Sequence, residues 1–225
     1  MTDDIELPKL RGREQEALLR KVLSVCDKSA GSLSYVSPVA LYLPTDNGVT
    51  EADAVFIHES GVYVFECKHM TGAVSGKLRD RMWTKTGDGR VLSFTNPVIQ
   101  NRKHAEAAAV FFGVKREDCF SCVVFNDACD ISRIEKGGER IWKTSEVKAE
   151  LAPYLLKKRF SKGETERLIK KAEKAASSAV GLIGFMSYLS TIIRGYRNAL
   201  RCPIERIVTL CNTTCGVILI RKVHC

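Results

Sequence analysis

The chain has 225 residues, of which 45% are hydrophobic and 27% are charged, a composition that excludes a disordered or fibrous protein and allows one domain with a good core plus an appendage. Its formal net charge of +9 comes from the C-terminal third: residues 151–225 contain 14 Lys and Arg against 4 Asp and Glu, whereas residues 1–150 contain 21 against 22. A polyanion or an anionic membrane surface would meet that third. The alternative is that these charges simply lie on solvated helix faces and bind nothing.

The N-terminal sequence MTDDIELPKL is acidic and lacks an apolar stretch, so we expect no secretory signal and a cytoplasmic location. In a reducing compartment the nine cysteines are expected as thiols or metal ligands, not as disulfides. The pattern along the chain predicts a domain over residues 10–175, followed over residues 176–225 by an apolar helix and a cysteine-containing tail.

Residues 12–26 predict an amphipathic helix, because apolar side chains recur at helical spacing at Leu19, Val22, Leu23 and Cys26. Glu16 lies one turn before this stripe and can lean toward the core side. The alternative for Glu16 is an exposed helix glutamate.

Residues 32–43 favour a β-strand, and residues 44–48 form a turn that ends it. Residues 51–68 then contain two short apolar runs, AVFI and VYVF, joined by the tight connection HESG, which predicts a β-hairpin. Asp53 opens the first strand of this hairpin, and Glu66 and Lys68 close the second. Because side chains alternate along a strand, Glu66 and Lys68 point to one face and Cys67 to the other.

Three charges at the ends of two apolar strands need an explanation, because burial of a lone charge is costly. Asp53 and Glu66 would supply the oxygen ligands that Mg²⁺ or Mn²⁺ prefers, and Lys68 would lie beside an attacked phosphate and the nucleophilic water. The alternative is that these residues end strands at a solvated edge, where Lys68 makes a surface ion pair.

Residues 72–94 predict a meander of short strands around several glycines. Asn96 and Pro97 then start a helix that runs through Phe112, with the proline at a first-turn position where its missing N–H costs little. The helical spacing would bring Gln100 back over the strand ends.

Residues 119–126 form a short apolar run typical of a buried central strand. Its Cys119-x-x-Cys122 spacing has no second pair nearby, so structural thiols are favoured over a metal or redox site. A last strand is predicted over residues 140–143. A helix that runs to about residue 159 follows, with a cap formed by Thr144, Ser145 and Glu146. A capping box over residues 161–164 predicts another helix that runs to about residue 174.

The run from Ala175 to Ile193 has no charge and is long enough to span a bilayer, although serines and glycines dilute it. Two alternatives stay open: a membrane anchor that faces the cytoplasm, or a helix packed on a partner. Beyond it, four thiols would suit a tetrahedral zinc site, although only one pair has the usual knuckle spacing: Cys202, Cys211, Cys215 and Cys225.

Taken together, these motifs resemble the NERD (nuclease-related) domain, a branch of the PD-(D/E)xK, restriction-endonuclease-like superfamily. The family's opening helix falls on Gly12 and Glu16, although Gln15 stands where a second glycine is usual, which makes Glu14 a rival of Glu16. The remaining motifs match in the right order at Asp53, Glu66, Lys68, Gly72, Trp83, Asn96, Pro97, Gln100 and His104. The resemblance covers residues 10–125. In some relatives a zinc ribbon follows, and residues 215–221 look like a fragment of one.

The resemblance implies an α/β fold with a restriction-endonuclease-like core, a mixed β-sheet flanked by helices and a helical C-terminal extension. It also implies a metal-dependent nuclease that acts on nucleic acid, with DNA as the expected substrate. Asp53 and Glu66 would hold the metal, with Glu16 acting through water, Lys68 would orient the nucleophile and stabilise charge, and Gln100 would position the water or Lys68. The alternatives are an inactive nucleic-acid-binding module and a membrane-tethered adaptor that uses the apolar run 175–193.

Overall fold

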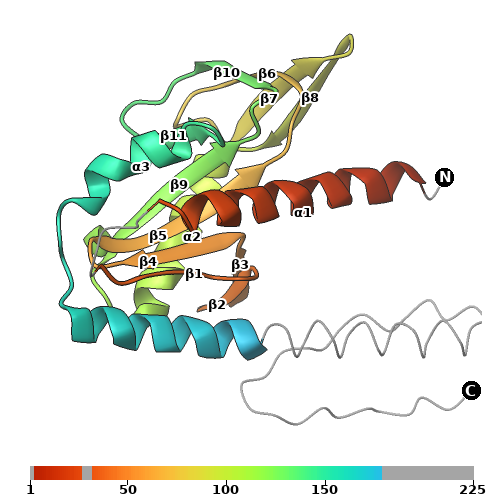
Figure 1. The fold of residues 1–225 in the computed structure, drawn as a ribbon. Helices are drawn as coiled ribbons and strands as arrows, with labels where there is room; N and C mark the ends of the chain where they lie inside the picture. The colour runs from red at the N-terminus through yellow and green to blue at the C-terminus, as the bar shows by residue number, and fades with distance from the viewer. Residues whose placement is uncertain (1–2, 27–31, 179–225) are drawn as a thin grey trace, which may run out of the picture. The chain divides into compact units, whose positions relative to one another are not determined.

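The computed structural model describes residues 3–26 and 32–178, with side chains from residue 10 onward (Figure 1). All of these residues fall in the first of two compact units, which comprises Met1–Leu182. Statements about the structure below concern this part of the chain.

The centre of the domain is a five-stranded mixed sheet. Its order is β1, β4, β5, β9, β11, with bounds Ser34–Val36, Ala54–His58, Gly61–Lys68, Cys119–Phe125 and Arg140–Lys143. β1, β4 and β5 are antiparallel neighbours, whereas β5, β9 and β11 run parallel. The expected hairpin is therefore confirmed as the β4–β5 pair, and the run 119–126 is confirmed as a strand with neighbours on both sides.

Helices cover both faces of this sheet (Figure 1). α1 (Asp3–Leu23) and α3 (Val147–Leu155) pack on one face, against every second residue of the hairpin: Ala54, Phe56, Tyr63 and Phe65. α2 (Pro97–Phe112) and the helix 162–178 pack on the other face with the small β2–β3 hairpin (Leu41–Thr45 and Gly48–Ala52), against Val55, Ile57, Val62 and Val64. The expected α/β class, with a mixed sheet flanked by helices and a helical C-terminal region, is confirmed.

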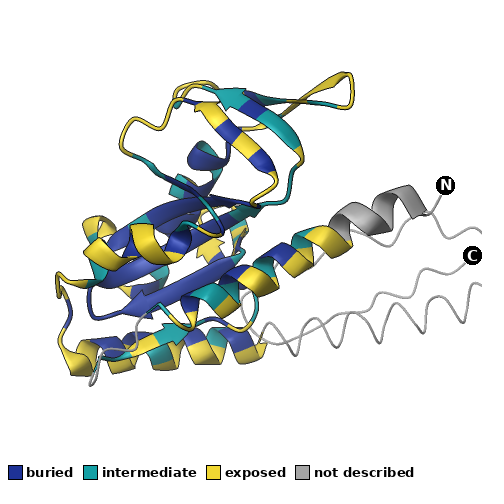
Figure 2. Ribbon diagram, turned by 45° about the horizontal axis from the view of Figure 1, so that its top comes forward, coloured by how far each residue is buried: buried dark blue, intermediate teal, exposed yellow. Residues whose placement is uncertain are grey.

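Both hairpin strands are apolar on both faces because each face is covered. Every residue of β4 and the first six of β5 are buried, and Figure 2 shows the central sheet as buried through most of its length. A strand in a sheet that is covered on both faces needs apolar side chains on both faces, so its sequence is a continuous apolar run.

A second, four-stranded sheet continues from the ends of β5 and β9. Its order is β10, β6, β7, β8, with bounds Cys129–Ile134, Gly72–Gly76, Met82–Gly87 and Arg90–Thr95. Its inner face carries the buried Trp83, which packs with Val98 of α2 and with Val123 and Phe125 of β9. The meander over residues 72–94 is thus confirmed. The expected strand over residues 32–43 is instead two strands of different sheets, β1 and β2, and three elements have no counterpart among the expected ones: β3, β10 and the short 3-10 helix η1 (Arg116–Asp118).

Two helices differ in length from the sequence-based expectation. α1 begins at Asp3 instead of near residue 12, because its N-terminal turns are polar and carry no apolar stripe that would mark them. α3 ends at Leu155 instead of near residue 159. The backbone N–H groups of Arg159 and Phe160 both donate to the carbonyl of Glu59 in the β4–β5 turn, so the chain leaves the helix to bond to this turn.

The expected cap of α3 is also different. Glu146 is the N-cap residue but makes no side-chain cap bond, and its carboxylate accepts from the N–H of Lys143. The next helix, 162–178, has the expected capping box: Ser161 Oγ accepts from the N–H of Glu164, whose carboxylate accepts from the N–H of Ser161. This helix continues past the expected end near residue 174, and Ala176 is buried in the core.

The Cys119 and Cys122 thiols are free and lie on opposite faces of β9. Cys119 packs with the α2 side of the core and Cys122 with the α1 side, as residues three apart on a strand must. Burial raises the pKa of both thiols to about 12. The pair therefore cannot share a metal ion, and the structural interpretation of these cysteines is correct.

Among the helices of the described ranges, none is both long and apolar enough to cross a bilayer. The apolar run 175–193 lies outside these ranges beyond residue 178. The four cysteines considered as a zinc site also lie outside the described residues: Cys202, Cys211, Cys215 and Cys225.

Candidate active site

The hairpin register places Asp53 and Glu66 opposite each other. Ala54 pairs with Phe65 across the antiparallel ladder, so the next position brings Asp53 to Glu66. Glu66 shares a strand face with Val64 by alternation, and because Val64 faces α2, the carboxylate of Glu66 lies on the α2 side of the sheet. Asp53 lies in the bend just before β4.

Glu66 and Lys68 form a buried ion pair at the end of β5. Lys68 Nζ donates to Glu66 Oε1 at 2.5 Å and to Gln100 Oε1 at 3.3 Å. The side chain of Glu66 is 3% exposed and that of Lys68 is 21% exposed, so this is not a surface ion pair. The structure thus brings together three of the predicted residues, including Gln100 from α2.

The second oxygen of Glu66 faces a histidine. His104 Nε2 lies 3.3 Å from Glu66 Oε2, and His104 Nδ1 lies 2.6 Å from Thr50 Oγ1 of β3. Among the described residues, neither Glu66 Oε2 nor His104 Nε2 has a hydrogen bond of normal geometry. A buried carboxylate oxygen without a hydrogen-bond partner is costly, and a cation is one remedy.

Asp53 is the most strongly perturbed acid of the site. Its Oδ2 accepts from the N–H of Cys67 at 2.7 Å. Burial, followed by the repulsion of Glu66, raises the pKa of Asp53 to about 7, and Glu16 adds to the rise, while the Cys67 N–H and Lys68 oppose it. Two carboxylates thus share a poorly solvated corner in which Lys68 does not neutralise both.

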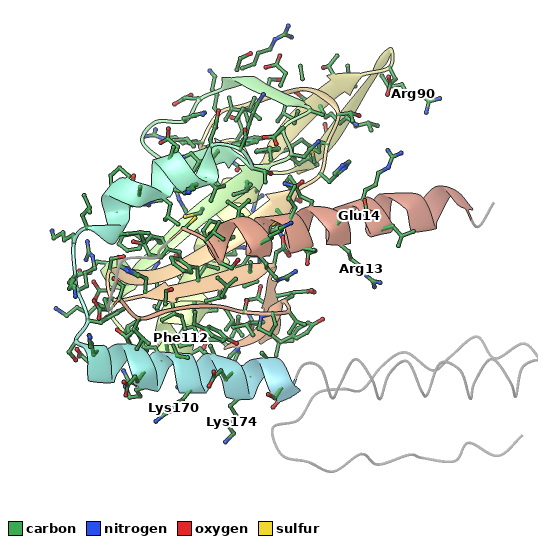
Figure 3. The ribbon with its side chains drawn as sticks, viewed as in Figure 1. Arg13, Glu14, Arg90, Phe112, Lys170 and Lys174 are labelled. Atoms are coloured by element: carbon green, nitrogen blue, oxygen red, sulfur yellow. The ribbon has the colours of Figure 1, made fainter. Side chains whose placement is uncertain are left out.

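Glu16 reaches this corner from α1. It is half-buried and pairs with Arg20 at 3.2 Å, and the guanidinium of Arg20 also donates to the carbonyl of Asp53. Glu14 is exposed on α1 (Figure 3). Of the two rival glutamates, Glu16 is therefore the one whose charge acts on Asp53.

Several residues that shape the site were not assigned a role from the sequence. Gln15 is buried and donates to Thr144 Oγ1 at 2.5 Å, which ties α1 to the start of α3. Asn101 Nδ2 lies 2.8 Å from the carbonyl of Val64 and 2.9 Å from that of Cys122, which fixes α2 on β5 and β9 beside Gln100. The spacing of His104 from Gln100 is a signal for its place near the site, whereas nothing in the sequence marks Thr50.

The donors present suit a hard cation that needs few protein ligands. Among the described residues no three His, Cys, Asp or Glu side chains form a metal cage. Mg²⁺ is commonly held by one or two carboxylates, with water and phosphate oxygens completing its octahedron. Asp53 and Glu66, whose Oε2 accepts no hydrogen bond, fit that pattern and do not fit a structural zinc site.

One groove of the described residues does not coincide with this corner. It has a volume of about 420 Å³ and lies on the second sheet, where its lining includes Ser75, Lys77, Thr84 and Arg133. Asp53 and Glu66, and not the groove, are the candidate site, because the perturbed acid and the buried charges are there.

Comparison with known proteins identifies the family of the chain. The sequence matches the nuclease-related domain (NERD) family over residues 11–126, a range that includes the five predicted site residues Glu16, Asp53, Glu66, Lys68 and Gln100. It is also 32% identical, over 129 residues, to an uncharacterized protein of Bacillus anthracis, and the aligned part is 57% of this chain and 58% of the relative. The chain therefore spans less than two thirds of that relative's length. Because the family match covers more than half of the sequence, the chain belongs to the NERD, or nuclease-related domain, family.

Proposed function

We propose that the protein is a metal-dependent nuclease that hydrolyses phosphodiester bonds of nucleic acid, with DNA as its substrate. The observation that carries the proposal is the pair of crowded carboxylates: Glu66 is buried with one oxygen that accepts no hydrogen bond, and burial together with the charge of Glu66 raises the pKa of the adjacent Asp53. Family membership supports the reaction class, because the family is defined by its relation to nucleases.

In this proposal Asp53 and Glu66 hold Mg²⁺ or Mn²⁺. When bound, the ion would neutralise charge on the scissile phosphate and make its bound water a better nucleophile. Lys68 orients the nucleophile and stabilises the negative charge that develops on the phosphate. Its Nζ bonds to Glu66 and Gln100 hold the ammonium group at the end of β5, where a phosphate would meet it.

Gln100 and Glu16 have supporting roles. The side-chain oxygen Oε1 of Gln100 accepts from Lys68, so it sets the direction of the ammonium group. Glu16 approaches from α1 through its ion pair with Arg20, and it contributes to the site by charge and through water rather than by a direct bond to Asp53.

The experiment that tests the proposal is cleavage of supercoiled and linear DNA with Mg²⁺, with Mn²⁺ and with EDTA. We expect cleavage that requires the metal and disappears in Asp53→Asn and Glu66→Gln. The matched control is Glu14→Gln on the exposed side of α1, which should cleave at the wild-type rate. Cleavage that survives EDTA, or that both site variants retain, would refute the proposal. Nucleic-acid binding without any cleavage would instead identify an inactive binding module.

A further inference from the structure

The second sheet carries a ribbon whose charge differs from that of its surroundings. Residues 77–92, here called the basic ribbon, comprise the β6–β7 loop, β7 and the start of β8. They contain five Lys and Arg against two Asp, while the rest of residues 1–150 contains sixteen against twenty. The described N-terminal part of the chain is thus acidic apart from this ribbon.

The charges of the basic ribbon are available to a ligand. Four of its cations are exposed and the fifth, Lys85, is half-buried: Lys77, Arg79, Arg81 and Arg90. Among the described residues, no carboxylate lies within ion-pair distance of any of the five. The side chain of Asp80 accepts from the backbone N–H of Lys77 and so shapes the loop.

Two connections fix the basic ribbon to the candidate active site. Asn96, which caps α2 through the N–H of Val98, also donates to the loop carbonyls of Leu78 and Asp80. One turn further along α2, Gln100 accepts from Lys68. At the other end of the ribbon, a Cβ at Gly72 would collide with the carbonyl oxygen of Thr86, so the connector from Lys68 passes directly under β7.

The far end of the ribbon projects from the body of the domain. The β7–β8 turn is tight, with positive φ at Asp88 (52°) and Gly89 (69°), and Arg90 follows at the tip (Figure 3). Val91 and Leu92 are 66% and 56% exposed on opposite faces of β8, and Figure 2 shows the hairpin tip standing clear of the buried core. β8 is the edge strand of this sheet, and its residues 90–92 bury neither face, so a bound partner would cover apolar surface that the domain itself leaves exposed.

The outer face of the same sheet offers hydrogen-bond donors in a row. The register aligns Arg133, Ser75, Thr84 and Ser93 across four strands, and the first three of these line the groove of about 420 Å³ with Lys77. Hydroxyl, lysine and arginine side chains are the types that contact phosphate oxygens in protein–DNA complexes. Asp80 and Glu135 lie at the margin of this groove.

The side chains favour a duplex over a single strand. Proteins that bind single strands stack bases on exposed aromatic rings. In the basic ribbon Trp83 is buried, and the described residues expose just one aromatic ring appreciably, Tyr42 of β2. The two groups of cations, at the loop and at the tip, are separated by the length of β7, about 20 Å for six residues, which is long enough to reach across a groove about 12 Å wide to phosphates on both sides.

We propose that the basic ribbon binds double-stranded nucleic acid through the phosphates of both strands and presents the duplex to the site at Asp53 and Glu66. This inference rests on the proposed function, since it names the form of substrate that the same site receives. Val91 and Leu92 at the tip would contact sugars or base edges within the groove.

The test measures binding apart from cleavage. The full chain is titrated in EDTA against a fluorescein-labelled DNA duplex and against one of its strands alone, at several salt concentrations. We expect the wild type to prefer the duplex by about 10-fold or more. Arg81→Glu with Arg90→Glu should weaken duplex binding by about 10-fold or more and lower the salt slope of log K by about 2.

The matched control reverses the same number of charges elsewhere. Lys170 and Lys174 are exposed on the helix 162–178 and point away from the domain (Figure 3), so Lys170→Glu with Lys174→Glu should change duplex binding by less than about 3-fold. Circular dichroism and the melting temperature establish that each variant is folded. The milder pair Arg81→Ala with Arg90→Ala should show the same direction of change.

Three results would overturn the proposal: equal losses in the two charge-reversed pairs, tighter binding of the single strand, or no binding of the duplex by the wild type. None of these results bears on the proposed nuclease activity, which the cleavage assay tests separately. Conversely, ribbon-dependent duplex binding by a chain that cleaves nothing would refute the nuclease and retain the ribbon as a duplex-binding surface.

Discussion

Glu66 connects more of the site than any other residue. One of its oxygens accepts from Lys68, the other faces His104, and its charge raises the pKa of Asp53. Burial makes each of these interactions stronger than it would be in water, because water does not screen them. A change at Lys68 is therefore felt by the carboxylate as well as by a bound phosphate.

Replacement of Lys68 distinguishes a catalytic role of this residue from a purely structural one. If Lys68 stabilises charge on the phosphate, Lys68→Ala should lower kcat by about 10²-fold or more while the protein remains folded and binds Mn²⁺. The measurement is single-turnover cleavage beside Mn²⁺ affinity. Lys115→Ala is the control, because Lys115 forms an exposed ion pair with Glu117 at 3.7 Å and should alter neither quantity. Wild-type turnover in folded Lys68→Ala would remove this residue from the mechanism.

The residues of the site differ in how far the sequence could predict them. Asp53, Glu66 and Lys68 belong to one hairpin, so strand alternation and register bring them together before any tertiary contact is known. Thr50 belongs to β3, and its approach to His104 depends on how the β2–β3 hairpin packs on α2. Local patterns carry no information about that packing, which is why the Thr50–His104 contact could not be predicted.

At the scale of elements, α2 is held by two asparagines with different tasks. Asn96 joins its first turn to the β6–β7 loop, and Asn101 fixes it to the carbonyls of β5 and β9. Gln100 lies between them and points to Lys68. The position of Gln100 is thus set by its neighbours, and its own side chain is left for the site.

This division of tasks gives opposite expectations for adjacent residues of α2. Asn101→Ala should lower the free energy of unfolding by about 1 to 3 kcal/mol, because two buried backbone carbonyls lose a donor. Gln100→Ala should leave stability within about 0.5 kcal/mol and reduce turnover. Urea unfolding and cleavage rates of both variants check this. A Gln100→Ala variant that cleaves normally but unfolds early would reverse the assignment.

The sequence predicted elements with strong periodicity and missed those defined by tertiary bonds. The hairpin, the start of α2 at Asn96 and the capping box at Ser161 are local patterns, and all three are present. β10 follows a polar turn and pairs in parallel with β6, far earlier in the chain, so no local signal marks it. The end of α3 is set by the bonds of Arg159 and Phe160 to Glu59, which again are contacts distant in sequence.

At the scale of the whole molecule, the raised pKa of Asp53 links stability to pH. A carboxyl whose folded-state pKa is about 7, against an ordinary value near 4, binds its proton more tightly in the folded state. Its favourable contribution is complete below pH 4 and is lost as the pH rises to 7 and above. The metal-free protein should therefore lose stability between about pH 4 and pH 7.

Asp53→Asn tests this linkage. The amide oxygen can still accept from the N–H of Cys67 and carries no charge, so at pH 8 without metal the variant should be more stable than the wild type by about 1 to 3 kcal/mol, a rise of several degrees in Tm. Mn²⁺ should raise the Tm of the wild type at pH 8 and have no effect on the variant. Melting curves at pH 5 and pH 8 measure both effects. Equal pH dependence in the two proteins would show that Asp53 is not the linked group.

The helix 162–178 completes the core on the α2 side of the sheet. Leu168 on this helix is fully buried with Leu41, Ala108 and Phe112, although the family match ends at residue 126. Leu168→Ala should destabilise the protein by about 2 to 5 kcal/mol, whereas the same change at Leu156, which is 85% exposed, should cost less than about 0.5 kcal/mol. Chemical denaturation compares them. Equal midpoints would mean that the helix is not part of the folding unit.

The parallel pairing of β5 with β9 has a consequence for the order in which the site is assembled. The β4–β5 hairpin closes over a turn of two residues and can form in microseconds. Glu66 and Val123, in contrast, are separated in the chain by β6, β7, β8 and α2, so their strands pair only after that long segment has been accommodated. Pulse-labelling hydrogen exchange should therefore show protection of β4 before β9. A newly synthesised chain would hold both carboxylates together early, yet stay inert until α2 delivers Gln100 and His104, so cleavage activity should appear in the last and slowest phase of refolding.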